Sequence, residues 1–214
     1  MSINSTKIPV LASRLDLLQV SSSIRTLPRV GAVACPCLNV SEAKALVSVV
    51  DQLEYRPAKA KTGSDNAPVY QDFDLCYDVP SGHSLWEFAQ VIEQALTSAL
   101  AGAEVDSECY PLRLNDLIVQ RYPPGCAGIT PHRDHVRYGF LIAIILLTGD
   151  GYFGVCDDRQ GNESREIDFK PGDLLLMGGP GLIPNFRRPF HFVNGVTDWR
   201  RTIGLRYDTH KSDA

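Results

Sequence analysis

The chain has 214 residues, a formal net charge of −4 and a pI of about 5.7, and 44% of its residues are hydrophobic. This is the composition of an ordinary soluble protein that is long enough for one domain with a sizeable core. The acidic balance disfavours a protein whose main task is to grip phosphate backbones. The longest apolar run, residues 140–147, is far too short to cross a bilayer.

The cysteines give no sign of a metal site or of a disulfide framework. Six are present, at positions 35, 37, 76, 109, 126 and 156, and none forms a CxxC pair. We therefore expect free, buried thiols in a reducing compartment and no zinc site. Residues 1–10 lack the basic start and apolar run of a signal peptide, so we expect a cytoplasmic protein with no membrane association.

The first quarter of the chain predicts an arm, a strand and a helix. Residues 1–28 are serine-rich and only weakly periodic, which predicts a tail or partly ordered arm ahead of a single domain over residues 29–214. A strand is expected over residues 30–38. Asn39 and Glu42 then have the spacing of a helix start, and apolar residues recur at helical intervals up to residue 53. This helix should back a sheet.

The next segment predicts a loop, a strand and a second helix. Residues 55–68 are polar and aperiodic, which indicates either a mobile loop that covers a substrate or a plain surface connection. Residues 69–78 resemble a strand in pattern. Ser84 and Glu87 have capping-box spacing at the start of a helix that is expected to run to about residue 100.

From residue 115 onward, short apolar runs alternate with turn residues. We expect eight strands, near residues 116–122, 130–134, 139–147, 152–156, 165–169, 173–177, 190–193 and 199–207. The segments 149–151 and 194–195 carry turn signals. Strands of this number and spacing predict a closed double sheet.

Three side chains are candidate metal ligands. His132 and Asp134 are two residues apart, so in an extended backbone they leave the same face and can hold one metal ion. His191 is the expected third ligand, whereas His135 would point the other way. Two imidazoles and a carboxylate on one side of an octahedral ion leave three positions open, which is typical of non-haem Fe(II) oxygenases. Taken alone, the His-x-Asp pair also fits a solvated strand end.

The final predicted strand favours the metal interpretation. Arg200, Thr202 and Arg206 share one face of it, whereas Arg201 points outward. Two arginines on this small-residue face would be costly to bury without an anion. A dicarboxylate is a natural partner, because the guanidinium fork matches a carboxylate in bidentate fashion.

These residues together resemble the 2-oxoglutarate and Fe(II)-dependent dioxygenases, over residues 115–208. The likeness consists of the strand that ends in Arg121-Tyr122-Pro123-Pro124-Gly125, the His132-x-Asp134 pair, the turn Lys170-Pro171-Gly172-Asp173, and His191 followed by Arg200-x-Thr202. The interval of 57 positions from Asp134 to His191 suits the family. The Arg-x5-Arg and Tyr-x-Pro-Gly patterns look most like the AlkB-like branch.

The resemblance implies a mainly β fold with supporting helices: a double-stranded β-helix, or cupin-like jelly-roll, with two N-terminal helices packed on the sheet and a catalytic core over residues 115–208. It implies Fe(II) as the metal, 2-oxoglutarate as co-substrate and O2 as oxidant, with a ferryl intermediate and release of succinate and CO2. It further implies that Arg200 and Thr202 bind the distal carboxylate and that Arg206 lies nearer the iron. Tyr122 and Gln120 would bond the co-substrate, although AlkB-like strands usually carry Asn at the latter position.

Three functions fit these residues. The first is oxidation of a small molecule, such as an amino acid or secondary metabolite, and the acidic pI favours it. The second is AlkB-like demethylation of alkylated nucleic acid, which the motif spacing favours. The third is a cupin-like barrel that binds a metal or ligand without turnover. Arg187 and Arg188, just before His191, are either contacts for an anionic substrate group or solvated loop charges.

Overall fold

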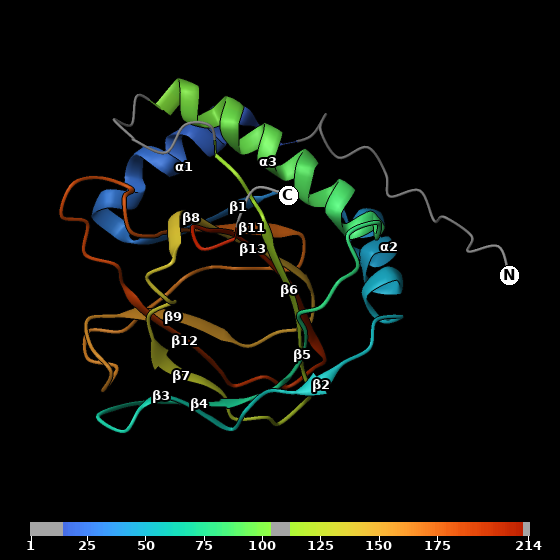
Figure 1. Ribbon diagram of the computed structural model, residues 1–214, viewed down its shortest axis with the longest axis vertical. Coiled ribbons are helices and arrows are strands. Elements are labelled where there is room, and N and C mark those ends of the chain that lie inside the picture. Colours follow the sequence, from blue (N-terminus) through green and yellow to red (C-terminus); the bar gives the residue numbers. More distant parts are fainter. Residues whose placement is uncertain (1–14, 104–111, 212–214) are drawn as a thin grey trace, which may run out of the picture.

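The computed structural model describes residues 15–103 and 112–211, and these form three layers (Figure 1). Helices cover one face of a seven-stranded sheet, and a six-stranded sheet lies against its other face. The strand orders are β1-β11-β8-β13-β6-β5-β2 and β10-β9-β12-β7-β4-β3, and the paired strands are antiparallel. The predicted class, mainly β with supporting helices, is confirmed.

The elements follow the predicted order with several shifts. They are α1 (Leu17–Val30), β1 (Ala32–Pro36), α2 (Val40–Val50), β2 (Arg56–Pro57), β3 (Lys61–Ser64), β4 (Ala67–Asp72), β5 (Asp74–Cys76), α3 (Ser84–Ala103), β6 (Asp116–Tyr122), β7 (Gly128–His132), β8 (Tyr138–Thr148), β9 (Tyr152–Cys156), β10 (Arg165–Glu166), β11 (Asp173–Gly178), β12 (Phe190–Asn194) and β13 (Arg200–Asp208). No helix among the described residues is long and apolar enough to span a membrane.

Alternate residues of the seven-stranded sheet face two different hydrophobic cores. On β6, Leu117 and Val119 belong to the core beneath the helices, whereas Ile118 and Tyr122 belong to the core between the sheets. Apolar side chains are therefore needed on both faces, which explains why the central strand β8 is an almost unbroken apolar run.

The predicted N-terminal arm is wrong for residues 17–28, which lie in α1; residues 1–14 lie outside the described part of the chain. The Asp16 carboxylate accepts hydrogen bonds from the backbone amides of Leu18 and Gln19 and caps the helix. Val20, Ile24 and Leu27 are buried. Three consecutive serines separate Val20 from Ile24, so the helical spacing of the apolar residues is hard to recognise in the sequence. The described residues thus contain three helices where two were predicted.

The other two helices lie close to their predicted positions. The capping box at the start of α2 is confirmed, since Asn39 and Glu42 bond each other's backbone amides. Helix α3 begins at Ser84 itself, and His83 Nδ1 accepts the Leu85 amide at 3.3 Å, so His83 takes the capping position predicted for Ser84.

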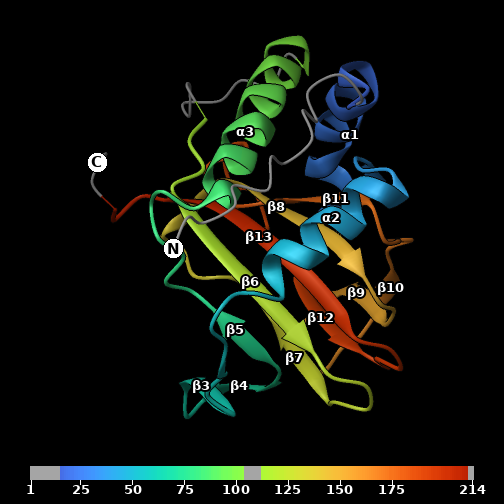
Figure 2. The same cartoon turned by 90° about the vertical axis from the view of Figure 1, so that its right-hand side faces the viewer.

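The loop predicted over residues 55–68 is largely a hairpin. Strands β3 and β4 pair at the edge of the six-stranded sheet, at the end of the molecule away from α1 and α3 (Figure 2). Their side chains are mostly polar and partly or fully exposed, so they carry no apolar alternation. The strand predicted over residues 69–78 is interrupted at Phe73, where the chain passes from the six-stranded to the seven-stranded sheet.

Four of the five described cysteines are free and buried, as predicted: Cys35, Cys37, Cys76 and Cys156. Cys126 is free but only half-buried, and Cys109 lies outside the described residues. Burial raises the pKa of Cys35 to about 11 and that of Cys37 to about 12, so these two thiols stay protonated at neutral pH.

Candidate metal centre and co-substrate cavity

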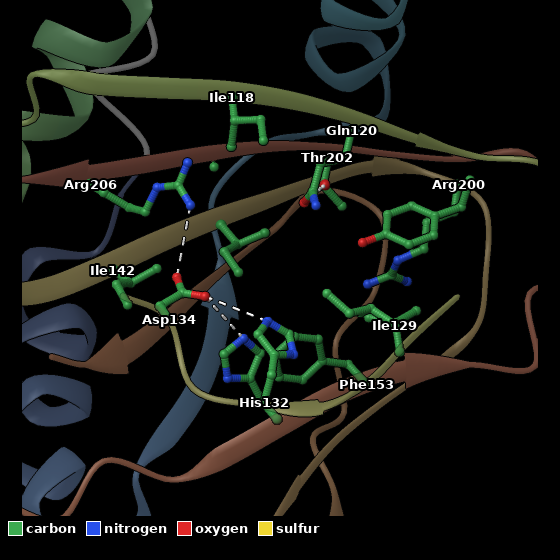
Figure 3. A pocket seen from close by; sticks show the side chains of 15 residues that line it. Ile118, Gln120, Ile129, His132, Asp134, Ile142, Phe153, Arg200, Thr202 and Arg206 are labelled. Atoms are coloured by element: carbon green, nitrogen blue, oxygen red, sulfur yellow. Dashed lines mark hydrogen bonds and ion pairs between the residues drawn. The ribbon is translucent and has the colours of Figure 1, made fainter. Parts of the chain in front are cut away.

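The structure brings the three predicted metal ligands together. His132 is the last residue of β7 and pairs directly with His191 on β12, so their rings lie 4.2 Å apart. Asp134 lies beyond the end of β7, and the prediction that the strand reaches it is wrong. The turn nevertheless carries its Oδ1 to 3.6 Å from Nε2 of each histidine (Figure 3). One ligand atom from each residue lies within 4.8 Å of the other two.

The protonation states of this trio suit a divalent metal. Burial lowers the pKa of His191 to about 3, so its ring is neutral at pH 7. Burial alone would raise the pKa of Asp134, but the contact with His132 and the charge of Arg206 outweigh it and hold that pKa well below its usual range. His132 Nδ1 lies 3.0 Å from the Thr130 carbonyl, which fixes the proton there and leaves Nε2 free to ligate. Two neutral imidazoles and a carboxylate are the donor set expected for Fe(II).

The predicted co-substrate residues come from the opposite sheet. On β6 and β13, Tyr122 pairs with Arg200 and Gln120 pairs with Thr202. Together with Arg206, they line the same cavity as the three candidate ligands. The cavity has a volume of about 60 Å³. A buried water needs roughly 10–15 Å³, so the space suits a few waters or a small organic acid.

Arg200 is a buried cation without a carboxylate partner among the described residues. Its side chain is 1% exposed, and its Nη1 donates to the carbonyl of Asp150 at 3.0 Å. Its Nε is buried and has no hydrogen-bond partner, and burial lowers the pKa of the guanidinium. An isolated buried charge is costly, so this position favours an anionic ligand.

Arg206 lies beside the candidate ligand Asp134, and a second protein carboxylate, Asp116, already holds it. Its Nε and Nη2 lie 2.9 and 2.8 Å from Oδ2 of the fully buried Asp116, whereas its Nη1 faces Asp134 Oδ2 at 3.9 Å. Asp116 also accepts hydrogen bonds from Tyr77 and Lys211 at 2.7 and 2.6 Å. Sequence reasoning missed Asp116; its only signal is that strand pairing places it opposite Arg206.

The remaining co-substrate candidates are neutral polar groups. Thr202 Oγ1 donates to Gln120 Oε1 at 3.3 Å. The Tyr122 ring contacts Phe73 at 4.7 Å, and burial raises the pKa of its hydroxyl, which therefore stays protonated at neutral pH. Each can offer a hydrogen bond to a ligand that enters beside Arg200.

The other basic residues of the prediction lie outside this cavity. Arg188 donates to the Asp134 carbonyl at 2.6 Å, and Arg187 donates to the Asp157 carbonyl at 3.4 Å. Arg201 points away from the cavity, on the side where it was expected, and its Nε pairs with Asp51 Oδ1 at 2.6 Å. His135 is exposed and bonds the backbone of its own turn, consistent with its exclusion as a ligand.

Comparison with known proteins gives matches in structure and none in sequence. No protein-family model and no curated protein sequence matches this chain. A Pseudomonas putida prolyl-4-hydroxylase matches with a TM-score of 0.62 at 14% identity, over 89% of this chain and 99% of that one. A 2OG-Fe(II) oxygenase family oxidoreductase from Burkholderia pseudomallei matches with a TM-score of 0.60 at 16% identity, over 90% and 92%. The non-heme alpha-ketoglutarate-dependent epimerase SnoN of nogalamycin biosynthesis matches with a TM-score of 0.60 at 19% identity, over 89% and 83%.

The chain therefore has the jelly-roll-like fold of 2-oxoglutarate and Fe(II) oxygenases, and the predicted architecture is confirmed. Likeness at this level of identity speaks for the fold, and function has to be argued from the site.

Proposed function

We propose that this protein is an Fe(II)- and 2-oxoglutarate-dependent dioxygenase that oxidises a small molecule. One arrangement carries the proposal: a His-Asp-His trio on one sheet faces a buried, carboxylate-free arginine on the other, across a single cavity. A binding barrel for a neutral ligand would need neither the trio nor the uncompensated charge of Arg200.

In this proposal, His132, Asp134 and His191 hold Fe(II) and leave positions for the co-substrate and O2. When bound, the metal with 2-oxoglutarate and O2 supplies the oxidising power, and 2-oxoglutarate leaves as succinate and CO2. The neutral imidazole of His191 and the ionised carboxylate of Asp134 need no deprotonation before the metal binds at neutral pH.

Arg200 would bind the distal carboxylate of 2-oxoglutarate, with hydrogen bonds from Thr202 and Tyr122. The single hydroxyl proton of Thr202, which Gln120 Oε1 accepts in this structure, would turn to that carboxylate when 2-oxoglutarate binds. Arg206, fixed by Asp116, would hold the Asp134 carboxylate and present Nη1 to the metal-proximal end of the co-substrate.

Apolar side chains would exclude water from the reacting atoms. Those that line the cavity are Ile118, Ile129, Ile142, Ile144, Phe153 and Val193. Removal of water strengthens the charge pair at Arg200 and protects reactive intermediates from side reactions.

The test is succinate formation with and without each component. The purified protein should form succinate only when Fe(II), 2-oxoglutarate and O2 are all present. The double variant His132→Ala/Asp134→Ala should form none, and His135→Ala, one residue further on and off the metal, should behave as wild type. Undiminished turnover in the double variant would refute the ligand assignment.

One observation favours a second candidate. The Arg-x5-Arg spacing of Arg200 and Arg206 is what favours the AlkB-like branch and, with it, alkylated nucleic acid as substrate. Binding to an alkylated oligonucleotide that weakens steeply with salt would support this alternative. A cupin-like barrel without turnover would instead bind Fe(II) and consume no O2 with any substrate.

A further inference from the structure

A second pocket lies beside the metal trio, and arginines dominate its lining. It has a volume of about 300 Å³ and is formed by the end of α1, the connection from β9 to β10 and the segment before β12. Its charged lining residues are Arg29, Arg133, Arg165, Arg187, Arg188, Asp157 and Glu163. Five arginines against two carboxylates give a local positive excess in a chain whose net charge is −4.

These five arginines form no ion pair with a carboxylate of the described residues. Three of them donate to backbone carbonyls instead. Arg165 bonds the Val30 carbonyl at 2.8 Å, and Arg187 and Arg188 bond carbonyls at 3.4 and 2.6 Å. Each guanidinium has five N–H donors, so most donors stay available to a ligand.

Two arginines lie over the ring of Phe190, which follows the lining residue Pro189 in sequence, and one of them, Arg159, is not itself a lining residue. Arg133 lies over the Phe190 ring at 4.1 Å and Arg159 at 5.5 Å, and Arg133 Nε and Arg159 Nη1 are both buried without a hydrogen-bond partner. Arg133, Arg187 and Arg188 line this one pocket, and none of them is paired with an acid of the described residues, so their like charges repel one another. A bound anion would relieve this repulsion.

The pocket borders the metal trio through the backbone. Arg133 lies between the candidate ligands His132 and Asp134 in sequence, and Arg188 donates to the Asp134 carbonyl at 2.6 Å. Arg188 also lies two residues before β12, the strand that carries the third candidate ligand, His191. Val155, which lines the pocket, is paired with His191. A ligand held by these arginines would therefore lie next to the metal trio and outside the co-substrate cavity.

We propose that this arginine pocket binds the anionic group, a phosphate or a carboxylate, of a small-molecule substrate whose oxidised part lies at the metal. The substrate role rests on the proposed function, whereas anion binding does not. The pocket volume lies at the lower end of the roughly 300–1,000 Å³ range of small-molecule sites. Arginine is suited to both groups, because its planar fork matches carboxylate and phosphate oxygens.

Calorimetric titration of the metal-free protein tests anion binding without any redox chemistry. Inorganic phosphate and tricarballylate are the probes, and their relative affinities separate a phosphate from a carboxylate site. At least one should bind saturably, and the double variant Arg165→Ala/Arg187→Ala, which changes two exposed side chains, should bind it about tenfold more weakly or worse. Arg56→Ala, an exposed arginine on β2, is the matched control and should bind as wild type. Binding of neither probe, or equal binding by the double variant, would overturn the proposal.

Succinate formation across anionic, neutral and cationic small molecules tests the substrate role. Stimulation should come from anionic compounds, and the double variant should raise their KM about tenfold or more while changing kcat less. Stimulation by neutral or cationic compounds alone would overturn the inference and leave the proposed function standing. Phosphate binding with no succinate from any compound would refute the proposed function and the substrate role together, with the anion site retained. A single-stranded oligonucleotide that displaces phosphate, with steep salt dependence, would overturn the small-molecule class in favour of nucleic acid.

Discussion

Replacement of Arg200 by alanine is expected to weaken 2-oxoglutarate binding strongly at little cost to the fold. The side chain is 1% exposed and has no carboxylate partner among the described residues, so a bound carboxylate would be its main counter-charge. Breaking such a buried pair costs about 2–5 kcal/mol, and the lower bound corresponds to a roughly thirtyfold higher Kd. The metal-free, ligand-free protein should lose less, because the substitution also removes an unpaired buried charge.

Thermal or urea unfolding with and without 2-oxoglutarate, with Mn(II) in place of Fe(II), measures this effect. At a concentration of about 100 times the wild-type Kd, the ligand stabilises wild type by about 2.7 kcal/mol, and a thirtyfold weaker Kd leaves about 0.9 kcal/mol. Arg201→Ala is the matched control, because the neighbouring arginine points outward to Asp51. An unchanged ligand-induced shift in Arg200→Ala, or the same loss in Arg201→Ala, would refute the assignment of the co-substrate anchor.

Three further predictions concern the metal face and the fold. Burial lowers the pKa of His191 to about 3 from 6.5, so the unfolded chain binds more protons, and the metal-free protein should lose stability as pH falls from about 6.5 towards 3. Urea unfolding at pH 7 and pH 5 should show a slope of at most about 1.4 kcal/mol per pH unit, shallower in His191→Gln. Leu27→Ala should cost about 2–5 kcal/mol in the same assay because the side chain is fully buried, whereas exposed Leu18→Ala should cost less than about 0.5 kcal/mol. Gly128→Ala should lower both stability and Mn(II) affinity, because a Cβ there would overlap the backbone of β12, whereas Gly82→Ala has open space.

Each of these predictions has an outcome that would contradict it. If His191→Gln unfolds with the wild-type pH slope, the histidine is not held neutral by burial. If Leu27→Ala is harmless, α1 does not contribute to the core. If Gly128→Ala binds Mn(II) as wild type does, the pairing of β7 with β12 does not set the position of His132.

The sequence predicts those helices and strands in which burial requires apolar residues at regular intervals along the chain. Strands β6 and β9 lie where they were predicted. A strand can be recognised in the sequence when its apolar side chains either occupy both faces or alternate with polar ones. Helix α1 was missed because serines interrupt its apolar face, and two of them, Ser21 and Ser23, are themselves buried. Strand β3 was missed because it lies at a sheet edge and needs no apolar face.

The candidate site was predictable to the extent that its residue types are chemically distinctive. Two histidines and an aspartate at suitable spacing point to the candidate metal trio, and Arg200 stands out on the small-residue face of its strand. Asp116 was not predictable, because it acquires a role only when strand pairing places it against Arg206. The arginine pocket was not predictable either, because its residues come from separate segments that are brought together only by the fold.

The proposed iron ligands belong to the six-stranded sheet and the turn that follows β7, whereas the proposed co-substrate anchor, Arg200, belongs to the seven-stranded sheet. The distance that 2-oxoglutarate would have to bridge, from the iron ligands to Arg200, is therefore the distance between the two sheets. The apolar side chains packed between the sheets set that distance. Ile144 packs against the core between the sheets and lines the cavity. A bulkier or smaller residue at position 144 would shift the preference between 2-oxoglutarate and its longer or shorter homologues. The choice of co-substrate would then depend on the packing between the two sheets as much as on the polar groups that bind the co-substrate.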